Sequence, residues 1–285
     1  MRKAPNELPV LALGPATALI VFVIVLPQLL LLRFSLNRFD PVQLMVEAVT
    51  LDNYVQALTD PFYLSVLTRT FAVSAICVLI CLVLGFPLAY TISRTQSRRM
   101  KELLFLILIT PLLIGNAART IGWIVMLGEG GAINSTLRAT GLIETPLQLM
   151  HTTTGVIIGL VSILLPYMVV AIQSVIDGID PALEEAASGL GAGSLTMARR
   201  ILVPLAMPGI FAGTILTLVL GMGAYATPVF IGGPAFHMMA PKIYEQIVRA
   251  NNWPMGATLS FMLLLLSVVV TIVATKTMQK WYGRL

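Results

Sequence analysis

The chain has 285 residues, of which 57% are hydrophobic and only 11% are charged, and its formal net charge is +5. Ordinary soluble domains carry about 25% charged residues. The composition therefore excludes a soluble globular protein and predicts an integral membrane protein. Its two cysteines, Cys77 and Cys81, lie four residues apart in one apolar run, which excludes a disulfide framework and favours buried packing.

Long uncharged runs predict the membrane spans. Residues 8–32, 70–93, 152–176 and 250–275 each form a run of at least 24 residues, and roughly 20 suffice to cross a bilayer. Residues 103–128 predict a further span with one charge, Arg119. The 41 uncharged residues of 201–241 predict one helix over about 205–230 and then a loop at Gly232-Gly233-Pro234. The sequence thus predicts an all-α protein with six transmembrane helices. The first run is too long for a cleaved signal and is expected to be retained.

Lysine and arginine predict the orientation of these helices, because they concentrate in cytoplasmic loops. With the N-terminus in the cytoplasm, 11 of the 18 basic residues lie on the cytoplasmic side and 7 on the other. The clusters at 94–101 and 276–284 carry most of this bias. Both termini, and the polar segment 177–200, are therefore expected in the cytoplasm.

The segment 177–210 is the one long polar interruption of the apolar pattern. Asp180 is a suitable N-cap and Pro181 suits the first helical position. Four apolar residues then recur at three- and four-residue spacing, and Glu184, Glu185 and Ser188 lie off this stripe: Leu183, Ala186, Ala187 and Leu190. Glycines at 189, 191 and 193 are expected to end the helix, and Ser194 is expected to cap a second one.

Two interpretations of this first helix are open. A helix lying on lipid should carry basic residues on its polar face, yet acidic residues come first here and no basic residue precedes Arg199. The stripe is mostly alanine, which suits close docking in a protein groove. The pattern favours docking on a protein over lying on lipid.

The spacing of this segment resembles the EAA loop of ATP-binding-cassette (ABC) importer permeases of the binding-protein-dependent, MetI-like family. Glu185-Ala186-Ala187 is followed by Gly191 and then by Ile201 and Pro204; Val203 departs mildly from the family's leucine. Arg119-Thr120 with Trp123, and the segments 130–134 and 252–257, are similar to the spermidine/putrescine branch.

The resemblance implies a permease subunit in the bacterial inner membrane, with a cytoplasmic coupling helix between spans 4 and 5. Residues 1–60 would form the first span and an extracytoplasmic loop, and residues 61–285 the permease core. The implied partners are a cytoplasmic ATPase dimer that binds ATP and magnesium, a second permease that is a different chain, and an extracytoplasmic substrate-binding protein. The implied ATPase-coupling residues are Leu183, Glu184, Glu185, Ala186, Ala187, Leu190 and Gly191.

The sequence offers no catalytic or cofactor site of its own. No Gly-Lys dipeptide is present, which excludes a Walker A phosphate loop. The two histidines, His151 and His237, lack metal-ligand spacing, and Gly221-x-Gly223-x-x-Ala226 fits helix packing better than a dinucleotide fingerprint. We therefore expect no enzyme activity, no cofactor and no nucleic-acid partner; ATP would be hydrolysed by the partner subunit.

Polar and aromatic residues within the spans are the candidates for a translocation pathway. Asn116, Arg119 and Trp123 share a helix face, and Tyr167 and Tyr225 can attract an organic cation by cation–π interaction. For Arg119, pairing with an outer-loop acid such as Glu129 is equally open. No acidic residue lies within a span core, so an anionic, opine-like or other amino-acid-derived solute stays an alternative to a polyamine. An ion-coupled secondary transporter or a scaffold is the alternative of another class.

Overall fold

The structure is a computed structural model that describes residues 7–282. Every regular element within these residues is a helix, apart from one isolated antiparallel bridge between Arg38 and Val46. The prediction of an all-helical protein is confirmed. The chain divides into two compact units, one formed by the residues up to Leu64 with Lys242–Leu264, the other by Ser65–Pro241 with the residues from Leu265 onward.

Two long helices cross from one unit into the other. They are α3 (Pro61–Arg94) and α13 (Trp253–Tyr282). The first unit contains in addition α1 (Glu7–Ser35), α2 (Asp52–Thr59), the end of α12 (Met239–Tyr244) and η2 (Glu245–Arg249). The remaining helices belong to the second unit: α4 (Arg98–Leu113), α5 (Asn116–Leu127), α6 (Ala132–Ala139), α7 (Thr153–Ile176), α8 (Ala182–Gly189), α9 (Ser194–Met197), η1 (Ala198–Leu202), α10 (Val203–Met222) and α11 (Ala226–Gly232).

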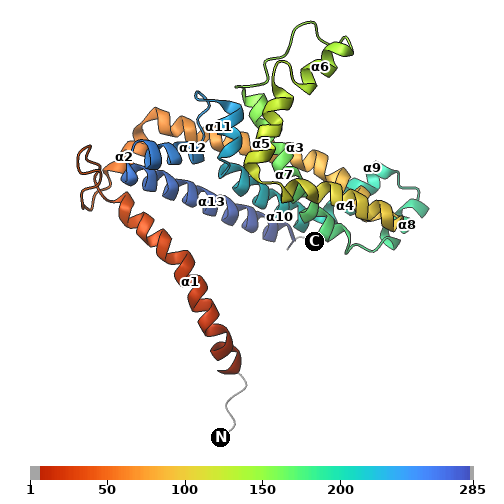
Figure 1. Ribbon diagram of the computed structural model, residues 1–285. Helices are drawn as coiled ribbons and strands as arrows, with labels where there is room; N and C mark the ends of the chain where they lie inside the picture. Colours follow the sequence, from red (N-terminus) through yellow and green to blue (C-terminus); the bar gives the residue numbers. More distant parts are fainter. Residues whose placement is uncertain (1–6, 283–285) are drawn as a thin grey trace. The chain divides into compact units, whose positions relative to one another are not determined.

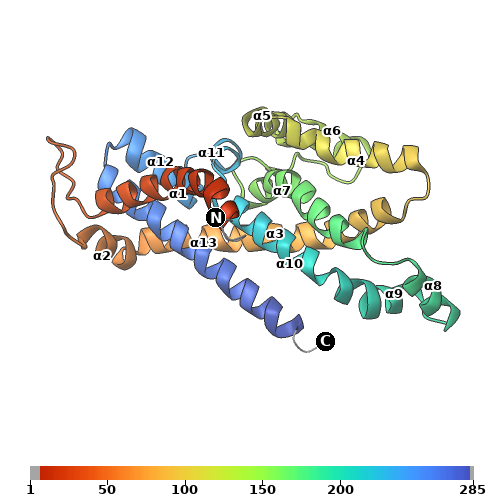
Figure 2. The same cartoon turned by 90° about the horizontal axis from the view of Figure 1, so that it is seen from below.

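The centre of the second unit is the packing of α7 on α10, which lie side by side (Figure 2). Two glycines one turn apart on α10, Gly209 and Gly213, allow this approach. A Cβ at Gly209 would lie 2.7 Å from the carbonyl oxygen of Ala171, and one at Gly213 would lie 2.7 Å from the sulfur of Met168. Small residues at this spacing let helix backbones pack closely in a membrane, where water does not drive the helices together.

Within residues 7–282, five helices are long and apolar enough to cross a membrane, and a sixth span results if a bent pair is counted as one. The five lie at Thr17–Ser35, Pro61–Arg94, Thr153–Ile176, Ser194–Met222 and Trp253–Lys280. The segment predicted as a straight span over 103–128 is the bent pair: α4 and the helical stretch from Asn116 meet at 102°. Ile114 and Gly115, with ψ of 128° and 143°, adopt non-helical angles that interrupt the hydrogen-bond ladder.

The single helix predicted over about 205–230 is wrong. The helix that begins at Ser194 runs through η1 and α10 to Met222, and α11 starts only at Ala226. Pro228 favours a break here, because it has no N–H to donate to the carbonyl of Ala224 and a continuous helix would lose that bond. Pro87 and Pro166, however, lie inside unbroken helices, so a proline alone does not decide where a span breaks. Ser194 is the first residue of α9 and Gly193 its N-cap, so the predicted capping by the serine side chain is also wrong.

Candidate functional site: the α8 segment and a cavity in the helical core

Helix α8 begins and ends as its sequence predicts, within one residue. The carboxylate of Asp180 accepts a hydrogen bond from the N–H of Ala182 at 2.9 Å, next to Pro181. At the other end Gly191 has φ of +82°. The N–H of Ala192 donates to the carbonyl of Ala187, and the N–H of Gly191 to that of Ser188, both at 3.0 Å. These two bonds form a Schellman motif, which requires a left-handed residue at the glycine position.

The residues of the predicted apolar stripe on α8 do not all face the same way. Leu183 and Leu190 are 47% and 90% exposed, and Ala186 is exposed as well. Ala187, by contrast, is buried against the rest of the chain. Transfer of an apolar side chain out of water lowers the free energy. The exposed leucines therefore form a surface suited to contact with a partner, and the exposed Glu185 lies on the same helix.

Glu184 shares the inward face of α8 with Ala187. Its Oε1 accepts a hydrogen bond from Nε of Arg94 at 2.7 Å and forms an ion pair with Nη2 of the same guanidinium at 2.6 Å. Its Oε2 accepts from the hydroxyl of Tyr90 at 2.8 Å. Arg94 also donates to the carbonyl of Ile179 at 3.0 Å. The sequence did not predict Tyr90 and Arg94 as partners of this helix, because the local pattern around them gives no information about a segment 90 residues away.

A second ion pair lies at the same end of the unit, where α8 and α9 are found near α4 (Figure 1). The ammonium of Lys101 lies 3.1 Å from the carboxylate of Asp177, and both side chains are 39% exposed. Exposed pairs of this kind contribute about 0–1 kcal/mol. Lys101–Asp177 therefore contributes little to holding the segment, in contrast to the Arg94–Glu184 pair, whose side chains are only 18% and 11% exposed.

A cavity of about 500 Å³ lies where α10 breaks. Its wall includes α5, α7, α10 and α11, and three of the five predicted pathway residues line it: Asn116, Tyr167 and Tyr225. Thr227, Gly223 and Ala224 add polar groups from the break and the start of α11. No charged side chain is among the residues that line it. Arg119 and Trp123, the other two predicted pathway residues, do not line the cavity.

Arg119 braces the bend between α4 and α5. One of its Nη atoms donates to the carbonyl of Ile114 at 3.1 Å and to the amide oxygen of Asn116 at 3.0 Å. A cation at the C-terminal end of a helix is stabilised by the helix dipole. No ion pair with Glu129 is found among the described residues. The other two guanidinium nitrogens of Arg119, Nε and Nη1, are buried and have no hydrogen-bond partner within residues 7–282.

A buried hydroxyl pair positions α11 at the cavity wall. The hydroxyl oxygens of Thr120 on α5 and Thr227 on α11 lie 3.4 Å apart, and both residues are buried. Gly159 on α7 makes room for α11, because a Cβ there would lie 2.7 Å from Ile231 and from Thr227. The sequence did not predict that Thr120 and Thr227 lie next to each other at the cavity, although Arg119-Thr120 forms part of a motif that it contains.

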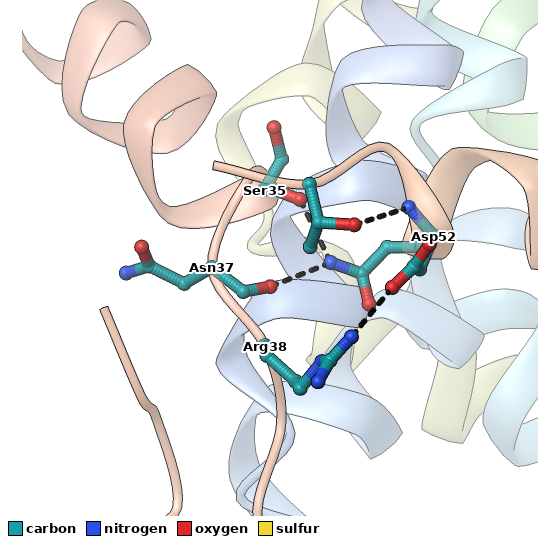
Figure 3. A network of polar contacts seen from close by, with 6 residues as sticks. Ser35, Asn37, Arg38 and Asp52 are labelled. Carbon is teal, nitrogen blue, oxygen red and sulfur yellow. Dashed lines mark hydrogen bonds and ion pairs between the residues drawn. The ribbon is translucent and has the colours of Figure 1, made fainter. Parts of the chain in front are cut away.

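The loop before α2 carries a separate polar network in the first unit (Figure 3). The side-chain amide of Asn53 donates to the carbonyls of Ser35 and Asn37, both at 2.8 Å. Arg38 pairs with Asp52 at 3.1 Å, and the N–H of Asp52 donates to the hydroxyl of Thr50. The Thr50 hydroxyl and then Arg38 lower the pKa of the Asp52 carboxyl. The network holds the end of α1 to the start of α2.

Comparison with known proteins identifies what this arrangement resembles. Residues 82–280 match the family described as "Binding-protein-dependent transport system inner membrane component". The spermidine/putrescine transport system permease protein PotB of Escherichia coli (strain K12) is 36% identical over 244 residues, which cover 86% of this chain and 88% of that protein. PotB of Haemophilus influenzae is 33% identical over 254 residues, 89% of this chain and 88% of that protein.

Solved structures share the fold. A chain of a bacterial ABC transporter involved in the import of the acidic polysaccharide alginate superposes with a TM-score of 0.75 at 16% identity, covering 96% of each chain. A chain of the MetNI methionine ABC transporter in an inward-facing conformation gives a TM-score of 0.58 at 18% identity, covering 78% of this chain and 99% of that one.

Proposed function

The chain belongs to the family of inner-membrane components of binding-protein-dependent transport systems, and from this premise we propose that it is a permease subunit of an ATP-driven importer for a polyamine such as spermidine or putrescine. The observation that carries the substrate class is the 36% identity with PotB over most of both chains. The family also places the chain in the inner membrane as a multi-pass protein, in agreement with the five or six candidate spans among residues 7–282.

The proposed topology has six spans with both termini in the cytoplasm. It counts α4 and α5 as one bent span, and the bias of lysine and arginine supports its orientation. Residues 1–60 would then form the first span and an outer loop, and residues 61–285 the permease core. Helix α8 would lie in the cytoplasm between spans 4 and 5.

The proposed partners follow from the family and from the exposed face of α8. A cytoplasmic ATPase dimer would bind this face through Leu183, Ala186, Leu190 and Glu185 and would hold ATP and magnesium, so that this chain itself hydrolyses nothing. The spermidine/putrescine transport system permease protein PotC of Escherichia coli (strain K12) is 38% identical over 108 residues, which cover 38% of this chain and 40% of that protein. That relation supports a second permease that is a different chain. An extracytoplasmic binding protein would deliver the solute.

The cavity at the break of α10 is the proposed substrate pathway. Tyr167 and Tyr225 line it, and aromatic faces attract organic cations. The last carbonyls of α10 carry the negative end of the helix dipole toward the break. The aromatic rings and the carbonyl groups would both attract the ammonium group of a polyamine, so the cavity needs no acidic side chain to bind it.

Arg119 favours a second candidate, an anionic or zwitterionic solute derived from an amino acid. It is hydrogen-bonded to Asn116, which lines the cavity, and two of its guanidinium nitrogens have no partner within residues 7–282. A carboxylate near Asn116 would be attracted by this charge and by the N-terminal end of α5. Arg119 and Trp123 would then act at the border of the pathway.

The test is reconstitution of the chain with the proteins that co-purify with it in mild detergent. Co-purification of an ABC ATPase and a second permease is expected. ATP-loaded vesicles with the binding protein should take up labelled spermidine or putrescine, and excess arginine or an opine should not compete. Competition by arginine or by the opine would favour the second candidate, the solute derived from an amino acid. Uptake that needs an ion gradient and no ATP would overturn the importer.

A further inference from the structure

The ion-pair cluster of Tyr90, Arg94 and Glu184 joins the end of α3 to α8. Both carboxylate oxygens of Glu184 are engaged, Oε1 by Arg94 at 2.6 and 2.7 Å and Oε2 by Tyr90 at 2.8 Å. Hydrogen bonds that involve a charged donor and a charged acceptor are about twice as strong as neutral ones. The cluster is thus a multi-point attachment between two helices that are far apart in the sequence.

Burial distinguishes this cluster from the other ion pairs at the same end of the unit. The side chains of Arg94 and Glu184 are 18% and 11% exposed, whereas those of Lys101 and Asp177 are both 39% exposed. Arg98 and Glu102 are 92% and 60% exposed. Separation of a buried pair leaves an unpaired charge with little water to solvate it. The Arg94–Glu184 contact therefore resists separation much more than the surface pairs.

The cluster also fixes the only covalent route from α7 to α8. That route is the short stretch 177–181, which contains Gly178. Arg94 donates to the carbonyl of Ile179 in its middle at 3.0 Å, while it holds Glu184 beyond it. The N–H groups of Gly178 and Ile179 donate to the carbonyls of Val175 and Ile176 at 3.1 and 3.0 Å, so the stretch is also held to the end of α7. The bonds from Arg94 add a link to α3, and they tie the end of α3, the connection and α8 together.

We propose that Glu184 is a positioning residue that transmits displacement of α8 to α3 through Arg94 and Tyr90, rather than a residue that binds the ATPase. This inference rests on the proposed function, in which an ATPase displaces α8. Its neighbour Glu185 is exposed, on the surface of α8 that the proposed ATPase would contact. Two adjacent carboxylates thus divide two roles: Glu185 faces outward and Glu184 connects the helix to the spans.

The test measures ATP hydrolysis and solute uptake in the same proteoliposomes that contain the complete complex. Glu184→Gln and Arg94→Gln should keep hydrolysis within about twofold and lower the uptake per ATP hydrolysed about tenfold, because they weaken the link and not the docking surface. The matched control is Arg98→Gln, which breaks an exposed pair and should leave the ratio unchanged. Glu185→Gln should instead weaken association with the ATPase.

A charge exchange provides the second measurement. The double variant Arg94→Glu with Glu184→Arg restores an ion pair at the same place and should recover most of the uptake per ATP. An unchanged ratio in Glu184→Gln, or a parallel loss of hydrolysis and uptake in the exchanged variant, would overturn the proposal. Failure of the wild-type complex to take up spermidine or putrescine with ATP refutes the proposed function instead, before any variant is compared.

Discussion

Replacement of Gly191 by alanine tests the turn that ends α8. Its φ of +82° lies in the left-handed region, and no heavy atom lies within 4 Å of an ideal Cβ at this position. Steric crowding by neighbours is therefore absent, and the cost is that of the backbone angle alone, about 1–2 kcal/mol for a residue with a side chain. Such a change lowers the equilibrium ratio of formed to open turn by a factor of about 5–30.

The structural consequence should be local. Loss of the turn breaks two hydrogen bonds of 3.0 Å each, from the N–H of Gly191 to the carbonyl of Ser188 and from the N–H of Ala192 to the carbonyl of Ala187. Amide hydrogen exchange over 187–192 should therefore accelerate by the same factor of about 5–30. Uptake by the reconstituted complex should fall in parallel. Gly191→Val, which is β-branched, should abolish uptake while the protein remains inserted in the membrane.

Gly189→Ala is the matched control. Gly189 is the last residue of α8, has no heavy atom within 4 Å of an ideal Cβ and has a helical backbone. Alanine there should stabilise the helix by about 0.5–1 kcal/mol. If Gly191→Ala exchanges no faster than Gly189→Ala, or transports at the wild-type rate, the turn does not have the role assigned to it.

Three further predictions concern other parts of the chain. Gly159→Val should destabilise the protein by about 1–3 kcal/mol in thermal unfolding, because a Cβ there would lie 2.7 Å from Ile231 and Thr227. Gly122→Ala, in the middle of α5 with no atom within 4 Å, should instead stabilise by about 0.5–1 kcal/mol. Arg119→Ala should accelerate exchange at the α4–α5 bend by about 10- to 150-fold, since hydrogen bonds to a charged group contribute about 1.5–3 kcal/mol. Arg119→Lys should restore part of the protection, and unchanged exchange in both would contradict the bracing role. The pKa of Asp52 is lowered by the Thr50 hydroxyl and then by Arg38, so the ionised carboxylate stabilises the loop above the ordinary value of about 3.9, and this contribution is lost as the pH falls through the lower pKa of the folded protein. NMR titration of the Asp52 carboxyl should show that its pKa rises in Thr50→Val and, by less, in Arg38→Gln. An unchanged Asp52 pKa in both variants would refute the assigned causes.

The sequence by itself determined the class of protein and the ends of α8. Long uncharged runs specify spans because each residue contributes to transfer into lipid independently of its neighbours in space. The turn at Gly191 was predictable for a similar reason, since a left-handed angle is a local property that selects glycine. Both features depend on residues close together in the chain.

Only the tertiary structure decided where the spans break and which face of α8 turns inward. The interruptions at Ile114-Gly115 and at Gly223–Tyr225 lie inside uncharged runs, whose hydropathy does not register a change of direction. On α8, helical periodicity separates one face from another but does not say which face meets a neighbour. Burial of Glu184 depends on Arg94, 90 residues earlier. A buried carboxylate is stable only when its partner is present, and that partner is supplied by the fold.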